Sequence, residues 1–359
     1  MPLIWCSISS HGYGHAAQVV PVLNALGRLV PDLSAVLRTT VPAEFFEPRL
    51  DIPWQLSVGQ QDVGCIQNGP LTIDVPGTWA AHRKLHTDWE KKVQAEATLI
   101  RNAGPACVLS DISHLGVAAG AATKIPTLGL CSLSWDLVLE PFADQSIEVH
   151  AAILRQIREA YAKADDFLRV APGLDVTAFR TLRDIGPIAE PTRPQMNRLR
   201  QAISAEDTDL IVLVGFGGIP LRELPFERME SMRPLRFIVD NPVPSGLTRV
   251  SSLAAIKLPF KQVLASVNLI LTKPGYGTIV EAVALGTPVV YVRRYNFADE
   301  QSLVDYLHRY GRGAELSLAD FRLGKWEPTI HHVIAQPLTS TPPPLSGAQD
   351  AAQVLRCYL

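Results

Sequence analysis

The sequence lacks any apolar run as long as the roughly 20 residues that a membrane-spanning helix needs. It also lacks an excess of charge, because 33 Lys and Arg stand against 35 Asp and Glu and leave a net charge of -2. No basic run marks a nucleic-acid-binding surface. We therefore expect neither a transmembrane segment nor a nucleic-acid partner. Peripheral membrane contact stays possible, since it requires only an apolar or basic surface patch.

Cysteine is scarce, and the five cysteines form no CxxC pair and no cluster with histidine: Cys6, Cys65, Cys107, Cys131 and Cys357. This pattern excludes the usual signatures of a zinc site or a disulfide framework. We interpret the cysteines as reduced thiols, mostly buried in apolar strands, and expect a cytoplasmic protein. A chain of 359 residues buries enough surface to fold without a disulfide or a structural metal.

Short apolar runs alternate with helical patterns along the whole chain. In the first half, we expect strands at 3–8, 33–39, 106–110 and 126–130, and helices at 15–29, 78–102, 115–123 and 143–164. In the second half, we expect strands at 210–214, 236–239, 269–272 and 288–292, and helices at 278–285 and 349–357. Such alternation predicts an α/β fold with parallel sheets and helices on both faces.

Two proline-rich stretches divide the chain, at 185–194 and 337–344. They predict a Rossmann-like N-terminal domain over residues 1–185 and a Rossmann-like C-terminal domain over residues 186–336. The last segment, 337–359, would end in a helix that packs back on the N-terminal domain. Two doubly wound halves are expected to bind ligands in the crevice between them, beyond the carboxyl ends of their strands.

The turn after the first strand carries two glycines and two histidines. Gly12 and Gly14 allow a sharp turn and a close approach to a ligand, and Gly14 is expected to face the donor. His11 or His15 would remove a proton from an acceptor hydroxyl. Asp111, after the strand 106–110, would orient either histidine. The alternative is that these side chains only cap helices.

A second glycine turn follows the strand 269–272 and reads Lys273-Pro274-Gly275-Tyr276-Gly277-Thr278. Backbone N–H groups, a helix N-terminus, the Thr278 hydroxyl and the Lys273 charge would together bind a diphosphate. Glu281, one helical turn further, would accept the ribose hydroxyls. Gly217, after the strand 210–214, is a further donor-binding candidate. The alternative is an ordinary helix start in which Thr278 and Glu281 form a capping box.

Two other groups of side chains complete the candidate site. Acidic and amide groups suit sugar hydroxyls, which both donate and accept hydrogen bonds, and such groups occur at Asp299, Glu300 and Gln301. Here the alternative is a polar helix start with Asp299 as the N-cap. Aromatic side chains would line the acceptor side, at Phe45, Phe46, Trp79 and Trp135, although most such residues are core residues.

In chain order, these motifs resemble the glycosyltransferase-B (GT-B) superfamily, in particular its family-1 transferases. The sequence is most similar to predicted bacterial glycosyltransferases related to the N-terminal half of plant-type L-arabinokinase. That resemblance covers most of the chain. It rests on Ser10-His11-Gly12-Tyr13-Gly14-His15-Ala16, Arg38-Thr39-Thr40-Val41-Pro42, Ser134-Trp135-Asp136 and Gly275-Tyr276-Gly277-Thr278.

The resemblance implies two Rossmann-like domains facing a central cleft. It implies inverting transfer of a sugar from a nucleotide diphosphate, UDP in most members, to an unidentified acceptor hydroxyl, without metal or cofactor. His15 matches the family's base, Glu281 its ribose ligand, and residues 299–301 its donor-sugar pair with one residue inserted. Lys273 departs from the pattern, because the family usually has a phosphate-binding histidine there. A sugar-nucleotide hydrolase or epimerase, or a non-catalytic nucleotide-sugar-binding protein, remains an alternative.

Overall fold

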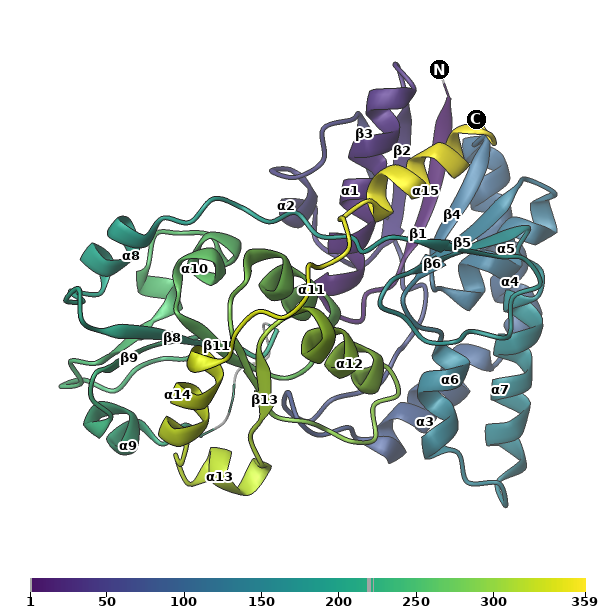
Figure 1. Cartoon of the computed structure of the whole chain (residues 1–359). Helices are drawn as coiled ribbons and strands as arrows, with labels where there is room; N and C mark the ends of the chain where they lie inside the picture. Colours follow the sequence, from purple (N-terminus) through teal and green to yellow (C-terminus); the bar gives the residue numbers. More distant parts are fainter. Residues whose placement is uncertain (1, 218–220, 222) are drawn as a thin grey trace.

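The computed structural model of the protein contains two parallel β-sheets, and helices flank each of them (Figure 1). The structure describes residues 2–217, 221 and 223–359. The first sheet consists of β1 (Leu3–Ile8), β2 (Ser34–Thr39), β3 (Trp54–Val58), β4 (Cys107–Asp111), β5 (Thr127–Cys131), β6 (Asp166–Val170) and β7 (Leu182–Ile185). The second consists of β8 (Leu210–Val214), β9 (Leu235–Val239), β10 (Val250–Ser252), β11 (Leu269–Thr272), β12 (Val289–Tyr291) and β13 (Gly313–Glu315).

Helices join most of these strands. Those of the first half are α1 (Tyr13–Leu29), α2 (Ala43–Phe46), α3 (Val75–His86), α4 (Trp89–Ala103), α5 (His114–Thr123), α6 (Trp135–Leu139) and α7 (Glu148–Tyr161). Those of the second half are α8 (Met196–Ala202), α9 (Phe226–Ser231), α10 (Phe260–Ser266), α11 (Tyr276–Leu285), α12 (Glu300–Tyr310), α13 (Leu318–Arg322), α14 (Glu327–Ala335) and α15 (Gly347–Arg356). Short 3₁₀ turns occupy Glu140–Phe142 and Leu253–Ala255.

The strand order of each sheet positions the candidate site. The first sheet runs β3-β2-β1-β4-β5-β6-β7 and the second β10-β9-β8-β11-β12-β13, both with parallel pairings throughout. This is the doubly wound arrangement, in which the order reverses beside the first strand of each sheet. Because β4 lies next to β1, with Ile8 paired to Asp111, the residues that follow these two strands meet at one edge. The predicted α/β class is confirmed.

Several predicted elements differ from the observed ones. The predicted helix 78–102 is two helices, α3 and α4, because Asp88 between them has the left-handed φ of 52°. The predicted helix 143–164 starts later, at Glu148. Strands β3, β6, β7, β10 and β13 were not predicted, because polar or charged residues interrupt each of these short segments and leave no apolar run to recognise.

The C-terminal helix α15 packs against α1 of the first domain, where the end of the chain returns beside its beginning (Figure 1). Its apolar residues, spaced as one helical face, enter the core around α1: Ala348, Ala351, Ala352 and Leu355. The backbone N–H of Gly186 also donates to Asp350 Oδ2 at 3.0 Å. The chain therefore passes between the two domains twice.

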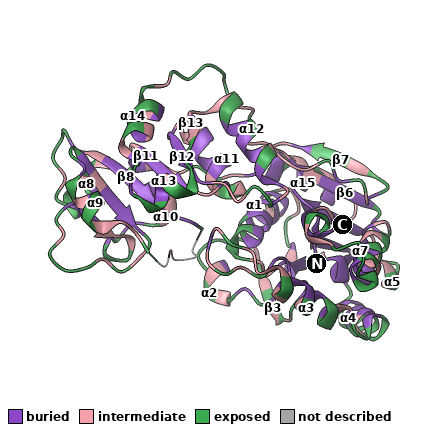
Figure 2. Cartoon of the chain, turned by 90° about the horizontal axis from the view of Figure 1, so that it is seen from below, coloured by how far each residue is buried: buried purple, intermediate pink, exposed green. Residues whose placement is uncertain are grey.

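The domains also exchange apolar side chains at their interface. Leu71, from the loop before α3, packs against the core of the second domain. Phe297, from the loop before α12, is buried in a cluster of the first domain with Trp79 and Trp135. The central strands of both sheets are buried, whereas β7 at the edge of the first sheet is partly exposed, and much of the other exposed surface lies on outer helices and loops (Figure 2). Among the described helices, none has the length and apolar character needed to cross a membrane.

Candidate active site

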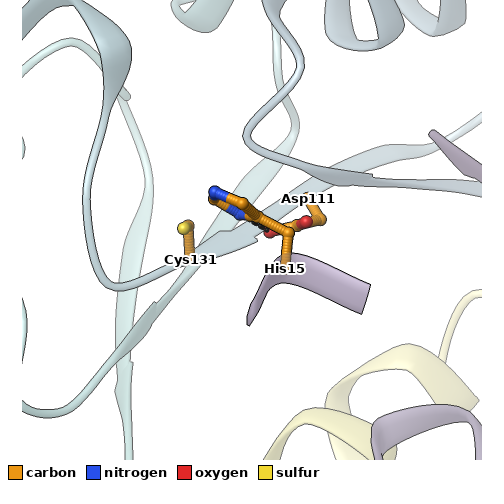
Figure 3. A group of neighbouring side chains, drawn as sticks. All are labelled: His15, Asp111 and Cys131. Carbon is orange, nitrogen blue, oxygen red and sulfur yellow. Dashed lines mark hydrogen bonds and ion pairs between the residues drawn. The ribbon is translucent and has the colours of Figure 1, made fainter. Parts of the chain in front are cut away.

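His15 and Asp111 form a buried pair at the carboxyl edge of the first sheet. His15 lies in the first turn of α1, and its Nδ1 is 3.1 Å from Oδ1 of Asp111, the last residue of β4. Asp111 has no exposed surface, and His15 is 9% exposed. Burial alone would lower the pKa of His15, but the carboxylate of Asp111 outweighs it and holds this pKa well above its usual value. With Nδ1 occupied, Nε2 is the nitrogen left to exchange a proton with a ligand (Figure 3).

His11 is held differently. The side-chain nitrogen of Gln67 lies 3.2 Å from His11 Nε2, and an amide nitrogen only donates, so this ring nitrogen accepts. Gly64 lies against the ring, because a Cβ built on it would be 2.5 Å from His11 Cγ. Burial, followed by the charges of His15 and Lys273, lowers the pKa of His11 to about 3. His11 is therefore neutral at physiological pH, and its lone pair is already hydrogen-bonded.

Two residues beside His15 were not predicted from the sequence as site residues. Asp62 is buried and accepts hydrogen bonds from Ser9 Oγ (3.0 Å) and Trp135 Nε1 (2.7 Å), and burial raises its pKa to about 6. Cys131 is buried at the end of β5. A signal existed for Cys131, since it ends a strand at the same edge as Asp111. Asp62 follows two glutamines in an irregular loop, where no periodicity indicates which side chains turn inward.

Lys273 stands on the opposite side, at the end of β11 in the second domain. Its ammonium group makes no hydrogen bond and no ion pair with any residue that the structure describes. Burial, followed by the charge of Arg294, lowers its pKa to about 8. A Cβ on Gly217 would lie 3.8 Å from Lys273 Cε, so these two donor-binding candidates are neighbours. Because the charge of Lys273 also acts on His11, the lysine faces the histidine turn across the domain interface.

The helix after Lys273 begins at Tyr276 with Gly275 as its N-cap. Thr278 therefore lies inside the first turn, and the capping-box interpretation of Thr278 and Glu281 is wrong. The first N–H groups of the helix, which include those of Gly277 and Thr278, have no acceptor within the helix. They are the kind of donors that bind phosphate oxygens.

Tyr276 serves the contact between the domains. Its hydroxyl donates to the carbonyl oxygen of Ala171 at 2.8 Å and accepts from the N–H of Ile188 at 2.9 Å. Its ring packs against the cores of both domains. Both hydrogen bonds of the Tyr276 hydroxyl are thus made at the domain interface. What Tyr276 could offer a phosphate is its backbone N–H, which belongs to the first turn of α11.

Glu281 lies on α11 and is 8% exposed. Its Oε1 is 3.0 Å from Lys261 Nζ, and the same ammonium group is 3.8 Å from Glu190 in the linker between the domains. Burial raises the pKa of Glu281, against the influence of Lys261. A ribose that binds Glu281 would have to share it with Lys261.

The three polar residues near the start of α12 have separate surroundings. Asp299 is buried, its Oδ1 has no hydrogen-bond partner among the described residues, and burial raises its pKa to about 6. Glu300 is fully buried and binds the side chain and backbone N–H of Arg294. Gln301 is exposed and donates to Asp305 Oδ1 at 2.7 Å. Asp299 is N-cap by position, but its side chain makes no capping hydrogen bond.

The four aromatic candidates for the acceptor side are placed at different depths. Phe46 and Trp135 have no exposed surface, and Trp79 is 2% exposed. Trp135 lies against both histidine rings, with centroid separations of 5.2 Å to His11 and 5.8 Å to His15. Phe45 is partly exposed and stacks at 5.3 Å on the exposed Tyr13. The Arg49 guanidinium also lies over the Phe45 ring, 4.5 Å from its centroid, so Phe45 is partly exposed but its ring is already in contact, whereas Phe46 is a core residue.

A cavity of about 670 Å³ opens between the domains. One wall is the segment 68–72, which follows the Gln67 that contacts His11. The other wall includes Leu224, Phe321 and Arg322 of the second domain. The cavity has the size of a small-molecule site.

No family model matches the chain. Over 339 residues it is 25% identical to L-arabinokinase of Arabidopsis thaliana, and the match covers 91% of the chain and 32% of that protein. The chain therefore spans about a third of the length of this relative.

Solved structures have the same fold over the whole chain. The glycotransferase of kitacinnamycin is 15% identical, with a TM-score of 0.65 and coverage of 100% of this chain and 99% of that one. Medicago truncatula UGT71G1, complexed with UDP-glucose, is 12% identical, with a TM-score of 0.62 and coverage of 99% and 94%. Phytolacca americana UGT2, complexed with UDP-2-fluoro-glucose and pterostilbene, is 14% identical, with a TM-score of 0.60 and coverage of 100% and 94%.

Proposed function

We propose that this chain, which has the GT-B fold, is a glycosyltransferase that moves a sugar from a nucleotide diphosphate to an acceptor hydroxyl. One observation carries the proposal: the histidine turn that holds the buried His15–Asp111 pair lies across the domain interface from Lys273, which has no hydrogen bond or ion pair with the described residues, and from the N-terminus of α11. The first group removes a proton, and the second binds an anion. Transfer of a sugar from a diphosphate to a hydroxyl requires both.

His15 is the proposed base, and His11 is not. Asp111 fixes the Nδ1 side of His15 and stabilises its imidazolium form, which is why the pKa of His15 is raised. His15 therefore acts as the base in its neutral form, in which Nε2 has lost its proton and takes that of the acceptor. His11 has no carboxylate partner, its Nε2 already accepts from Gln67, and its pKa of about 3 makes it a weak base. We place His11 against the donor or acceptor as a neutral hydrogen-bonding group.

In the proposed reaction, the acceptor oxygen attacks the anomeric carbon while its proton passes to His15 Nε2. The bond between that carbon and the diphosphate oxygen breaks, and the electron pair leaves with the diphosphate. Because base and leaving group lie on opposite domains, a single displacement inverts the anomeric configuration. Lys273 and the first N–H groups of α11 stabilise the leaving diphosphate, so the protein itself supplies the positive charge at this position.

A UDP-sugar is the proposed donor and a small hydroxylated molecule the proposed acceptor. Support comes from the Phytolacca and Medicago structures, which hold UDP-sugars, and from the former, which also holds pterostilbene. Glu281 is positioned one turn after Thr278, where it would bind the ribose. Asp299 has an unpaired buried oxygen suited to a hydroxyl of the transferred sugar.

A donor screen followed by variants tests the proposal. Thermal melting with UDP, dTDP, GDP and their sugars should identify the donor, since ligand at a hundredfold excess over its Kd stabilises by about 2.7 kcal/mol. With that donor and a panel of hydroxylated acceptors, His15→Ala should slow transfer by at least about a hundredfold, the usual contribution of a general base. Nucleotide binding should survive. His11→Ala is the comparison variant: because it removes a hydrogen-bonding group and not the base, it should raise KM more than it lowers kcat.

Each other outcome has a definite meaning. Turnover of His15→Ala at the wild-type rate would remove His15 as the base. Rapid loss of donor to free sugar or to an epimer, without acceptor, would instead identify a hydrolase or an epimerase. Nucleotide binding without turnover across the acceptor panel would identify a non-catalytic nucleotide-sugar-binding protein.

A further inference from the structure

Three different metal-ligand types meet at the proposed base. One ligand atom each from His15, Asp111 and Cys131 lies within 4.8 Å of the other two. The three residues come from separate elements, α1, β4 and β5, whose ends converge at the same sheet edge (Figure 3). All three are buried. Cys131 has no role in the proposed transfer, so its position at this point calls for a separate explanation.

A second feature points to a missing ligand at the same place. The side chain of Asp111 has no exposed surface, and its Oδ2 has no hydrogen-bond partner among the residues described. A buried carboxylate oxygen without a partner costs free energy that a bound cation would recover. Of the three residues, His15 keeps the most exposed surface, 9%.

The residue types match one class of cation. Imidazole nitrogen, carboxylate oxygen and thiolate sulfur bind Zn²⁺ at about 2.0–2.3 Å in tetrahedral geometry, which separates ligand atoms by roughly 3.3–3.6 Å. The cluster, with its atoms within 4.8 Å, needs to contract by about 1 Å at most. Hard cations such as Mg²⁺ prefer oxygen ligands, so a thiol and an imidazole favour a thiophilic cation.

We propose that His15, Asp111 and Cys131 form an inhibitory binding site for a thiophilic divalent cation such as Zn²⁺. The thiol of Cys131 and the imidazolium of His15 each lose one proton when the cation binds, and both protons are released to solvent. The cation takes one nitrogen of the His15 ring and the other keeps its proton, so the imidazole cannot accept the proton of the acceptor hydroxyl. The inhibition part of this inference rests on the proposed transferase function, whereas the binding part does not.

The binding test uses metal alone and needs no activity. All proteins carry Cys357→Ser, because Cys357 is exposed and would bind metal on the surface. Titration of Zn²⁺ against a chromophoric chelator should show one equivalent bound, with affinity at least about tenfold lower in Cys131→Ala. Cys107→Ala is the matched control, a buried cysteine on β4 outside the cluster, and should bind like the parent.

A spectroscopic measurement identifies the ligand atom. Co²⁺ added to the parent should give a near-ultraviolet thiolate-to-cobalt charge-transfer band, and Cys131→Ala should lack it. Cys131→Ser, which keeps the side-chain volume, replaces the alanine variant if the latter does not fold. Equal Zn²⁺ binding by parent and Cys131 variants, or a Co²⁺ complex without the band, would overturn the site.

Activity measurements with Zn²⁺ distinguish binding of the cation from inhibition of transfer. With an active parent, Zn²⁺ should lower kcat even at saturating acceptor, because the cation disables the base, and EDTA should reverse the effect. Zn²⁺ binding without inhibition of transfer would overturn the inhibitory role and leave the site. Zn²⁺ binding by a protein without transferase activity would refute the proposed function and leave the metal site standing.

Discussion

Lys273 provides the sharpest test of the proposed donor site. Its pKa of about 8 lies well below the usual 10.5 of lysine because the ammonium group is buried and lies near Arg294. A lysine of this kind loses its charge within a range of pH that the protein tolerates. When a diphosphate binds, the negative charge restores the pKa of the ammonium group, so binding requires the protonated form. Donor affinity should therefore fall as pH rises through about 8.

The size of the effect follows from the pKa. A group with a pKa of about 8 is roughly nine-tenths protonated at pH 7 and one-tenth protonated at pH 9. If the charged form is the one that binds UDP, the Kd for UDP rises about tenfold between these two pH values. The phosphates of UDP contribute little to this change, because a terminal phosphate has its last ionisation near pH 6.

Isothermal titration of UDP at pH 7, 8 and 9 measures the effect, with Lys273→Arg as the informative variant. A guanidinium stays charged over this range, so its Kd should be flat. Lys273→Met should bind weakly and equally at all three pH values. Lys325→Met, at an exposed lysine of the same domain, should follow the wild type. A flat wild-type profile, or a tenfold slope that persists in Lys273→Met, would refute the assignment of Lys273 to the phosphates.

Two further predictions concern stability. Tyr276→Phe leaves the N–H of Ile188 and the carbonyl of Ala171 without their partner, so urea unfolding should show a loss of about 1–3 kcal/mol. Its Kd for UDP should stay within about twofold, and a large rise would mean that the hydroxyl binds donor. His82 Nε2 donates to the carbonyl oxygen of Gly64, and burial lowers the pKa of His82 to about 4. Below pH 6.5 the unfolded chain therefore binds a proton at His82 that the folded protein does not bind. His82 should account for about 3 kcal/mol of the stability lost between pH 6.5 and 4, in addition to the loss that buried His11 causes over the same range. The loss in His82→Gln should therefore be smaller than in the parent by about that amount.

The alternation of short apolar runs with helical patterns was readable because it depends on neighbours in sequence. The strands Leu3–Ile8, Leu210–Val214 and Leu269–Thr272 have the predicted bounds, since each is a short run of mainly apolar residues. The parallel α/β class followed from the same pattern. Elements with weak local patterns, such as β7 (Leu182–Ile185), became recognisable only through their pairing with neighbouring strands.

At the site, sequence and tertiary structure supplied different information. The sequence named His11, His15 and Asp111, because histidines in a glycine turn and an acid at a strand end are local features. Only the adjacency of β1 and β4 decided that Asp111 meets His15, and only the loop carrying Gln67 decided that His11 is already hydrogen-bonded. That adjacency joins segments about a hundred residues apart, which no local pattern records.

Burial was likewise decided by the tertiary structure. Glu300 and Gln301 are adjacent in sequence, yet the first is sealed against Arg294 and the second faces solvent. From the sequence alone Cys131 is an ordinary core thiol. The pairing of β5 with β4 is what brings it close to His15 and Asp111. The sequence thus determined which chemical groups end each strand, because strands and turns are encoded locally. The packing of sheets and loops determined which of those groups touch, because contacts across the fold set both their distances and their pKa values.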